Sequence, residues 1–289
     1  MATDSHAHKS LAAEPALISP QATLIQAEIE RSRRRFYVGV VASWAVLLLL
    51  LGFVFSGIDT FIGPFRIKTI HLDPEFIAQW APFIAQGATQ TIYISFISII
   101  FATLLALFAA LARLSRISPV YALSTFYVSL IRGTPLFLQV MFFFLALPQM
   151  GIKLPGLWAG VLALGLNYGA YMSEIFRAGI LSVGKGQREA ALALGMTYSK
   201  MMRRVVLPQA LRFAIPPTGN EFIAMLKDSA LVSATGFVHE IMWRATKVGR
   251  ANFRNLEALL IAAVFYWFMT LLFTAVQTWL ERRMGRGDH

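Results

Sequence analysis

The sequence contains several apolar runs that are long enough to cross a lipid bilayer and carry no charged side chain. Phe36–Phe55, Phe76–Ala112 and Ala258–Leu280 hold no Asp, Glu, Lys or Arg. A helix rises about 1.5 Å per residue, so roughly 20 apolar residues cross a hydrocarbon core of about 30 Å. Only 14% of the residues are charged, whereas about 25% is usual in soluble proteins. These runs predict an all-α fold, a polytopic membrane helical bundle.

We expect about six membrane-spanning helices. The fifth is the least apolar, because it contains Glu221, Lys227 and Asp228. The third is interrupted at Arg132-Gly133-Thr134-Pro135, where Pro favours a break or a kink. The expected spans are Phe36–Phe55, about Gly87–Leu111, about Pro119–Leu147, about Gly156–Ile180, about Ile215–Phe237 and Ala258–Leu280.

Four glycines of the fourth span form two GxxxG spacings, at Gly156/Gly160 and at Gly165/Gly169. Small residues four positions apart let two helix backbones approach closely, which is the main packing device in lipid. We therefore expect this span to lie inside the bundle.

Basic residues near the ends of the spans predict the orientation. About twice as many Lys and Arg fall on the side of the N-terminus as on the other side. Cytoplasmic loops carry such an excess, so we expect a multi-pass protein with both termini in the cytoplasm. The segment His239–Arg254 is basic for an outer loop, and we interpret it as a short amphipathic element at the outer interface.

The net charge of +11 follows from these span ends, so the expected partner is the membrane and no nucleic acid. The chain has no cysteine, which excludes disulfides, thiolate metal sites and cysteine nucleophiles. We expect no catalytic residue and no metal site.

The loop between the fourth and fifth spans, residues 182–213, is long and regular. Gln187–Leu194 is rich in Ala and Leu, both strong helix formers, and Gly195 is a typical helix terminator. A second helical stretch, Tyr198–Val206, ends at Leu207-Pro208. The pattern predicts a helix–turn–helix at the membrane surface with a small, flat surface at Ala190 and Ala191. Such a surface suits the docking of a partner protein.

These residues also carry a family resemblance. Glu189-Ala190-Ala191-x-x-x-Gly195, followed after nine residues by Val205-x-Leu207-Pro208, resembles the EAA loop of ATP-binding-cassette (ABC) importer permeases. Further motifs resemble the polar amino-acid branch, the histidine/glutamine/arginine-type permeases. They are Arg132-Gly133-Thr134-Pro135-Leu136, Tyr168-Gly169-Ala170-Tyr171, Glu174-Ile175-x-Arg177-Ala178-Gly179, Gly186-Gln187 and Lys227-Asp228-Ser229-x-Leu231.

The resemblance implies a type I ABC importer transmembrane domain with an added N-terminal span, in the bacterial inner (plasma) membrane. It implies partner ATPase subunits, a second permease subunit (identical or paralogous) and a periplasmic or lipid-anchored amino-acid-binding protein. The EAA helix would be the coupling helix that sits in a groove of the ATPase. The implied coupling residues are Glu189, Ala190, Ala191, Gly195, Val205, Leu207 and Pro208.

Ionisable groups inside the membrane are costly and usually face a cavity or a partner. A polar amino-acid substrate has a carboxylate, which Arg132 or Lys227 would attract, and an ammonium group, which Glu221 or Asp228 would attract. Asn220 would add a neutral hydrogen-bonding group. The structural alternative is that Lys227 and Asp228 only satisfy neighbours within the bundle. For Glu174 and Arg177, we expect an ion pair on the helix surface.

The chain is not expected to be an enzyme. Gly184-Lys185 is followed by Gly186, so there is no G-x-x-x-x-G-K-[ST] loop to hold phosphates, and H-E-x-x-H and G-x-S-x-G are absent. The chain itself would bind no cofactor, and ATP and Mg would be bound by the partner ATPase. The alternatives are an ion-coupled secondary transporter for a small polar solute and a membrane-anchored scaffold or sensor.

Four segments follow from these expectations. They are a cytoplasmic polar tail (residues 1–35), an extra N-terminal transmembrane helix with an outer loop (36–86), the ABC transmembrane domain with its coupling loop at 182–213 (87–282) and a cytoplasmic tail (283–289).

Overall fold

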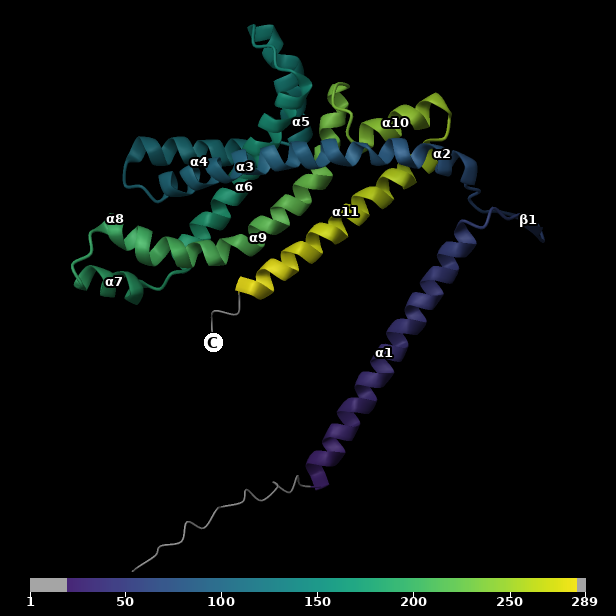
Figure 1. Cartoon of the computed structure of the whole chain (residues 1–289), viewed down its shortest axis with the longest axis horizontal. Coiled ribbons are helices and arrows are strands. Elements are labelled where there is room, and N and C mark those ends of the chain that lie inside the picture. Colours follow the sequence, from purple (N-terminus) through teal and green to yellow (C-terminus); the bar gives the residue numbers. More distant parts are fainter. Residues whose placement is uncertain (1–19, 285–289) are drawn as a thin grey trace, which may run out of the picture. The chain divides into compact units, whose positions relative to one another are not determined.

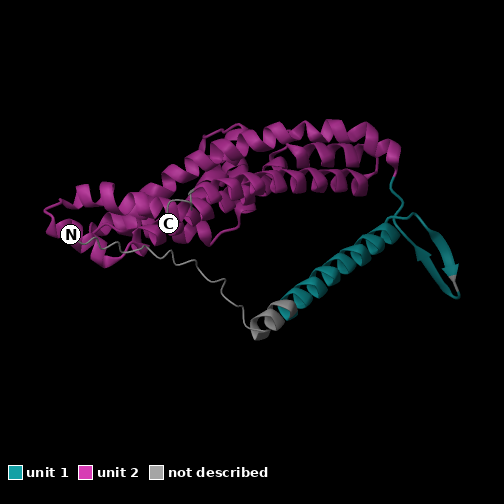
Figure 2. Ribbon diagram, turned by 60° about the horizontal axis from the view of Figure 1, so that its bottom comes forward, with its two compact units in different colours: residues 1–72 teal, residues 73–289 magenta. Residues whose placement is uncertain are grey.

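The computed structural model describes residues 20–284, which divide into two compact units (Figure 2). Unit 1 ends at Leu72 and unit 2 begins at Asp73. Parts of both predicted tails, residues 1–19 and 285–289, lie outside the described residues.

Unit 1 consists of one long helix and a β-hairpin. Helix α1 (Pro20–Val54) contains the predicted first span and starts well before it, so part of the predicted polar tail is helical. Most of its apolar side chains between Ile29 and Val54 are exposed, as in a helix surrounded by lipid. The strands β1 (Asp59–Ile62) and β2 (Phe65–Lys68) pair antiparallel around Gly63, which has a φ of +60°. The hairpin was not predicted.

An ion pair joins the two strands of the hairpin, and backbone hydrogen bonds join the hairpin to the end of α1. Arg66 donates two hydrogen bonds, of 2.8 and 2.7 Å, to the carboxylate of Asp59. The guanidinium of Arg66 therefore lowers the pKa of Asp59 below its usual value. The amide of Ile70 donates to the carbonyl of Val54 over 2.8 Å, which joins the hairpin base to the last turn of α1.

The described residues of unit 2 form helices joined by turns and loops, without a β-strand (Figure 1). In Figure 1, α7 and α8 lie at one end of this unit and α2 and α10 at the other. Its α-helices are α2 (Pro74–Ala85), α3 (Gly87–Arg113), α4 (Ser118–Arg132), α5 (Leu136–Met141), α6 (Gly156–Ser182), α7 (Lys185–Ala193), α8 (Tyr198–Met201), α9 (Leu207–Asp228), α10 (Ile241–Ala251) and α11 (Asn255–Met284). The remaining turns are the π-helices η1 (Phe142–Ala146) and η3 (Met202–Val206) and the 3₁₀ helices η2 (Leu147–Met150) and η4 (Ser229–Thr235).

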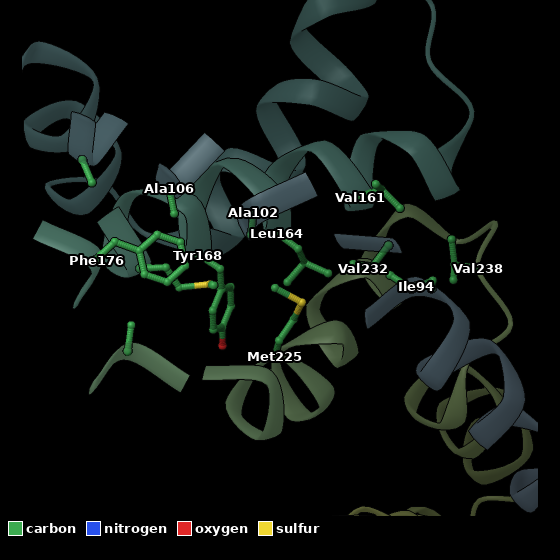
Figure 3. Packing of buried hydrophobic residues seen from close by; sticks show 13 residues of the cluster. Ile94, Ala102, Ala106, Val161, Leu164, Tyr168, Phe176, Met225, Val232 and Val238 are labelled. Atoms are coloured by element: carbon green, nitrogen blue, oxygen red, sulfur yellow. The ribbon is translucent and has the colours of Figure 1, made fainter. Parts of the chain in front are cut away.

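The core of unit 2 forms around α6 (Figure 3). Ala102 and Ala106 of α3, Leu164 and Tyr168 of α6, and Met225 of α9 belong to one buried cluster. The three helices α3, α6 and α9 are far apart in the sequence, so this cluster fixes how they pack in the bundle.

The two GxxxG pairs of α6 are buried, as predicted, and they face different partners. A Cβ at Gly160 would lie 2.3 Å from a methyl carbon of Val232 in η4. A Cβ at Gly165 would lie 2.2 Å from the ring of Phe101 in α3. Each pair thus allows a close approach that a larger residue would block.

Three helical segments of the described residues are long and apolar enough to cross a membrane, and a fourth arises if α4 and the segment from α5 to η2 form one broken span. The three are Glu28–Val54, Pro74–Arg113 and Asn255–Arg283. The predicted fourth and fifth spans are the helices α6 and α9, which do not reach this apolarity. Glycine and polar residues lower the mean hydropathy of both helices, and the glycines of α6 are buried inside the unit.

Two predicted boundaries differ from the structure. The fifth helix ends at Asp228, and the residues up to Thr235 form the 3₁₀ helix η4. Residues 74–85, predicted as part of the outer loop, form α2, which belongs to unit 2 and packs with α10 and α11. The predicted outer element His239–Arg254 is helical and corresponds to α10.

Candidate functional site

The predicted break in the third span is present. The helical segments on either side of residues 133–135 are bent by 104°. The amide nitrogen of Gln139, from α5, donates to the carbonyls of Ile131 (2.8 Å) and Thr134 (3.2 Å). The amide of Asn167 in α6 in turn donates to Gln139 over 3.2 Å. Side chains therefore satisfy backbone groups that the break exposes, as an irregular segment within a membrane requires.

A cavity of about 540 Å³ lies next to this break, and we call it the central cavity. It brings together one cationic and two anionic side chains, Arg132 of α4 and Glu221 and Asp228 of α9. The other residues that line it are Gly133, Thr134, Pro135, Leu136, Asn167, Tyr168 and Tyr171. Opposite charges thus line a single cavity formed by three chain segments.

Two residues that sequence analysis placed on this path do not line the cavity. Asn220 is exposed, and its Oδ1 accepts a hydrogen bond of 3.1 Å from Gln277 in α11. Lys227 is exposed as well. Their places on α9 differ from those of Glu221 and Asp228 because one turn takes about 3.6 residues, so direct neighbours point to different sides.

Asp228 and Arg132 are each held by an aromatic residue of α6. The hydroxyl of Tyr168 donates to Oδ2 of Asp228 over 2.8 Å. The guanidinium of Arg132 lies over the ring of Tyr171, 5.0 Å from its centroid. The two tyrosines therefore position charges that line the cavity. Neither was identified from the chemistry of the residues, although both belong to the Tyr168–Tyr171 motif of the family resemblance.

Behind the cavity, Glu174 is the centre of an arginine cluster. It forms ion pairs with Arg113 of α3, with Arg132 of α4 at 3.6 Å and with Arg177 of α6 at 3.0 Å. The side chains of Arg113 and Glu174 are only 17% and 27% exposed. The predicted pair with Arg177 is present, and it is part of a larger network that joins three helices.

The coupling loop, residues 182–213, has the predicted two helical stretches and a reversal at Gly195, where φ is +75°. This positive φ favours glycine, because side chains with a Cβ are strained there. The predicted end at Pro208 is wrong. The π-helix η3 leads directly into α9, so the helical path continues through Pro208, the second residue of α9.

The predicted contact surface of this loop is also corrected. Ala191 is only 3% exposed, because it packs in a small core with Ile180 and Met201. Val205 and Leu207 pack against the same core. The exposed members of the predicted set are Glu189, Ala190, Gly195 and Pro208.

Leu192 and Leu194 were not selected from the sequence, yet both are exposed on the coupling loop, Leu194 by 79%. An exposed leucine on a charged loop is a candidate contact for a partner. The sequence gives a weak signal for it, because the Ala/Leu-rich stretch is apolar on more than one side. In the described part of the chain, no group of three or more His, Asp or Glu side chains is placed to hold a metal ion.

Comparison with known proteins decides the family. The model of the family described as binding-protein-dependent transport system inner membrane components matches residues 75–286. The chain belongs to this family. Unit 2 contains the whole matched region, and α1 with the hairpin precedes it in the sequence.

Relatives in this family are closely similar. The arginine transport system permease protein ArtQ of Bacillus subtilis is 41% identical over 208 residues, which cover 72% of this chain and 94% of ArtQ. The L-cystine transport system permease protein TcyB of the same organism is 43% identical over 206 residues, covering 71% of this chain and 88% of TcyB. A crystal structure of an amino acid ABC transporter with histidines matches with a TM-score of 0.70 and 39% identity, over 74% of this chain and 100% of that one.

As a family member, the chain is the membrane-embedded component of a binding-protein-dependent ABC importer. It is a transport subunit rather than an enzyme, and a separate subunit hydrolyses ATP. Its general partners are an ATPase and a binding protein.

Proposed function

We propose that the permease carries a polar amino acid and that the central cavity forms part of its path. The observation that carries this proposal is the grouping of Arg132, Glu221 and Asp228 in one cavity beside a broken helix. Broken helices inside membranes are typical places for substrate sites, because their freed backbone groups and adjacent charges need a polar partner. Relatives named as arginine and L-cystine permeases support the substrate class.

The charges suit a zwitterion. Arg132 would attract the carboxylate of the substrate, since a guanidinium offers two parallel N–H groups to a carboxylate. Glu221 and Asp228 would attract the ammonium group. Tyr168 would keep Asp228 oriented, through the hydrogen bond that it donates to Oδ2. Asn167 lines the cavity too and replaces Asn220 as the neutral hydrogen-bonding group in this proposal.

The coupling loop would transmit closure of the ATPase to the bundle. Its exposed surface at Glu189, Ala190 and Leu194 would sit in the ATPase, and ATP and Mg would be bound there rather than by this chain. Ala191, Val205 and Leu207 would not contact the ATPase. They would pass its movement on, because they pack the loop onto the end of α6. A push on α7 would thus reach α6 and α9.

We propose an assembly of two permease subunits, identical or paralogous, with two ATPases and a periplasmic or lipid-anchored amino-acid-binding protein. Both termini would face the cytoplasm of a bacterial inner membrane, because the coupling loop and the start of α1 carry the basic clusters. An ion-coupled transporter or a scaffold is not favoured by any feature of the site.

Neutral substitutions in the central cavity test the proposed path. We expect Arg132→Gln, Glu221→Gln and Asp228→Asn each to reduce ATP-driven uptake, or to change the preferred amino acid, in proteoliposomes that contain the assembled transporter. Lys227→Gln is the matched control, because it removes a charge next to Asp228 but outside the cavity. If all three cavity variants assemble and transport like the wild type, the cavity is not the path.

A further inference from the structure

A second cavity lies where the coupling loop meets the turn between α3 and α4, and we call it the coupling-loop cavity. Its volume is about 920 Å³. Its walls come from the end of α3 and the turn after it, the end of α6, helix α7, and the segment from α8 through η3 into the start of α9. It shares no lining residue with the central cavity, and no feature of the transport path accounts for it.

The polar part of the coupling-loop cavity is cationic. Arg116 of the α3–α4 turn, Arg188 of α7 and Arg203 of η3 line it, and no lining residue is acidic. Within the described residues, neither the side chain of Arg116 nor that of Arg203 forms a hydrogen bond or an ion pair. Three positive charges that share one cavity repel each other, so an anion placed between them would stabilise the arrangement.

Arg188 adds an independent observation. One of its terminal nitrogens donates to the carbonyl of Ile180, which fixes the guanidinium against the end of α6. Its Nε is buried and has no hydrogen-bond partner. Burial closes Nε to the cavity, so an oxyanion there would accept from the other terminal nitrogen of Arg188, which is not among the buried groups.

The apolar part of the cavity distinguishes a lipid from a free anion. Leu111 of α3, Ile180 of α6 and Leu207 of α9 line it together with the three arginines. The uncharged run of α3 ends directly after Leu111, at Ala112, so the cavity lies where the hydrocarbon core gives way to headgroups. A phospholipid would fill both parts, with its phosphate at the arginines and its chains along the leucines.

We propose that the coupling-loop cavity binds the headgroup of an acidic phospholipid. Basic pockets between helices at this depth are suited to such headgroups. The phosphate would bridge Arg116, on the α3–α4 turn, and Arg188 and Arg203, on the coupling loop. Lipid binding would therefore tie the coupling loop to the bundle next to the surface proposed to contact the ATPase.

The test uses the permease purified in complex with its ATPase, titrated with phosphatidylglycerol or phosphatidylcholine and observed by native mass spectrometry. The variant is Arg116→Gln/Arg203→Gln. The control is Lys200→Gln/Arg204→Gln, which removes two charges from exposed neighbours that do not line the cavity. A third protein, Arg116→Lys/Arg203→Lys, keeps both positive charges. It tests the proposal even if the glutamine variant fails to fold. Co-isolation of the ATPase reports assembly in each case.

We expect the wild type and the control to retain phosphatidylglycerol in preference to phosphatidylcholine, and the glutamine variant to bind it about tenfold more weakly or worse, since two charge-assisted hydrogen bonds are lost. The lysine variant should lie between them. Equal retention by the glutamine variant and the wild type would overturn the proposal. So would displacement of the lipid by inorganic phosphate at similar concentration, which indicates a free-anion site. Cross-linking of the ATPase to the Arg203→Cys variant with no lipid retained would also overturn the proposal, because protein would then fill the cavity.

Discussion

The hydroxyl of Tyr168 donates a hydrogen bond of 2.8 Å to Oδ2 of Asp228, which joins the middle of α6 to the last residue of α9. A carboxylate at the C-terminus of a helix is unfavourable, because the exposed carbonyls there carry partial negative charge. The tyrosine hydroxyl offsets this by donating to the carboxylate. This hydrogen bond therefore connects Tyr168, a member of the buried cluster, to Asp228, a charged residue of the central cavity.

Removal of this hydroxyl should affect both stability and transport. We expect Tyr168→Phe to lower the free energy of unfolding by about 1–2 kcal/mol, because the half-buried Asp228 loses its donor. Thermal unfolding of the purified protein measures this, and uptake in proteoliposomes measures the effect on transport. Tyr171→Phe removes a hydroxyl of the same cavity that donates no hydrogen bond within residues 20–284, so it should cost less. Equal losses in the two variants would contradict the role given to Tyr168.

The arginine cluster around Glu174 should depend strongly on its one carboxylate. We expect Glu174→Gln to destabilise the protein by about 2–4 kcal/mol, a value reduced from that of a fully buried pair because the groups are partly exposed. Arg113, Arg132 and Arg177 would then repel one another without a shared anion. The midpoint of thermal unfolding checks this, with Glu30→Gln on the exposed face of α1 as the control. Similar midpoints for both variants would show that the cluster adds nothing to stability.

Glu240, just before α10, should make stability depend on pH. It is fully buried, and it accepts hydrogen bonds from the amides of Met242 and Trp243 and from the hydroxyl of Tyr266. Burial raises the pKa of Glu240 from its ordinary value of 4.5 to about 7. The folded state therefore holds a proton that the unfolded state has lost over this range. The resulting stabilisation is complete below pH 4.5, decreases as the pH rises and is absent above about pH 7.

The size of this effect is at most about 3 kcal/mol. Thermal unfolding between pH 4.5 and pH 7.5 should show the decline in the wild type, and Glu240→Gln should flatten it, because glutamine stays neutral at every pH. Glu75→Gln, at an exposed position in α2, should leave the slope unchanged. A wild-type slope that survives in Glu240→Gln would mean that another group titrates.

Leu194, the most exposed leucine of the coupling loop, should anchor the ATPase. We expect Leu194→Ser to weaken the affinity of the permease for the ATPase about tenfold, as is typical when an apolar anchor is lost from an interface. Co-isolation at a series of ATPase concentrations measures this. Ala193→Ser, the exposed neighbour, introduces the same side chain without removing an anchor. If both variants bind the ATPase like the wild type, the contact lies elsewhere on the loop.

The lipid-exposed helices could be predicted from the sequence, because in a membrane apolar composition alone decides them. The helices α1, α3 and α11 each contain most of one uncharged run, although α1 begins well before its run and α3 well after the start of its own. The break after Arg132 and the reversal at Gly195 were also predictable, since Gly and Pro act on the local backbone. The helix α6 has a weaker apolar signal because other helices cover much of it, whereas α9 has one because it carries polar residues such as Asn220, Glu221 and Lys227.

The remaining features depend on contacts between segments far apart in the sequence. Glu174 meets Arg113 across 61 residues, and Tyr168 meets Asp228 across 60. No local pattern predicts such pairs. The continuous path from α8 through η3 into α9 was missed because a proline within a helical pattern normally ends the helix, whereas here the π-helix η3 precedes it without a break. The hairpin was missed because two strands of four residues leave a short alternating pattern.

Reconstitution of uptake tests the central claim most directly. Proteoliposomes would contain the permease with its ATPase and any second permease subunit, with ATP inside, the binding protein outside and labelled polar amino acids as substrates. We predict uptake that requires ATP, the ATPase and the binding protein together and that Arg132→Gln reduces. Uptake by this chain alone, driven by an ion gradient and independent of ATP, would contradict the account.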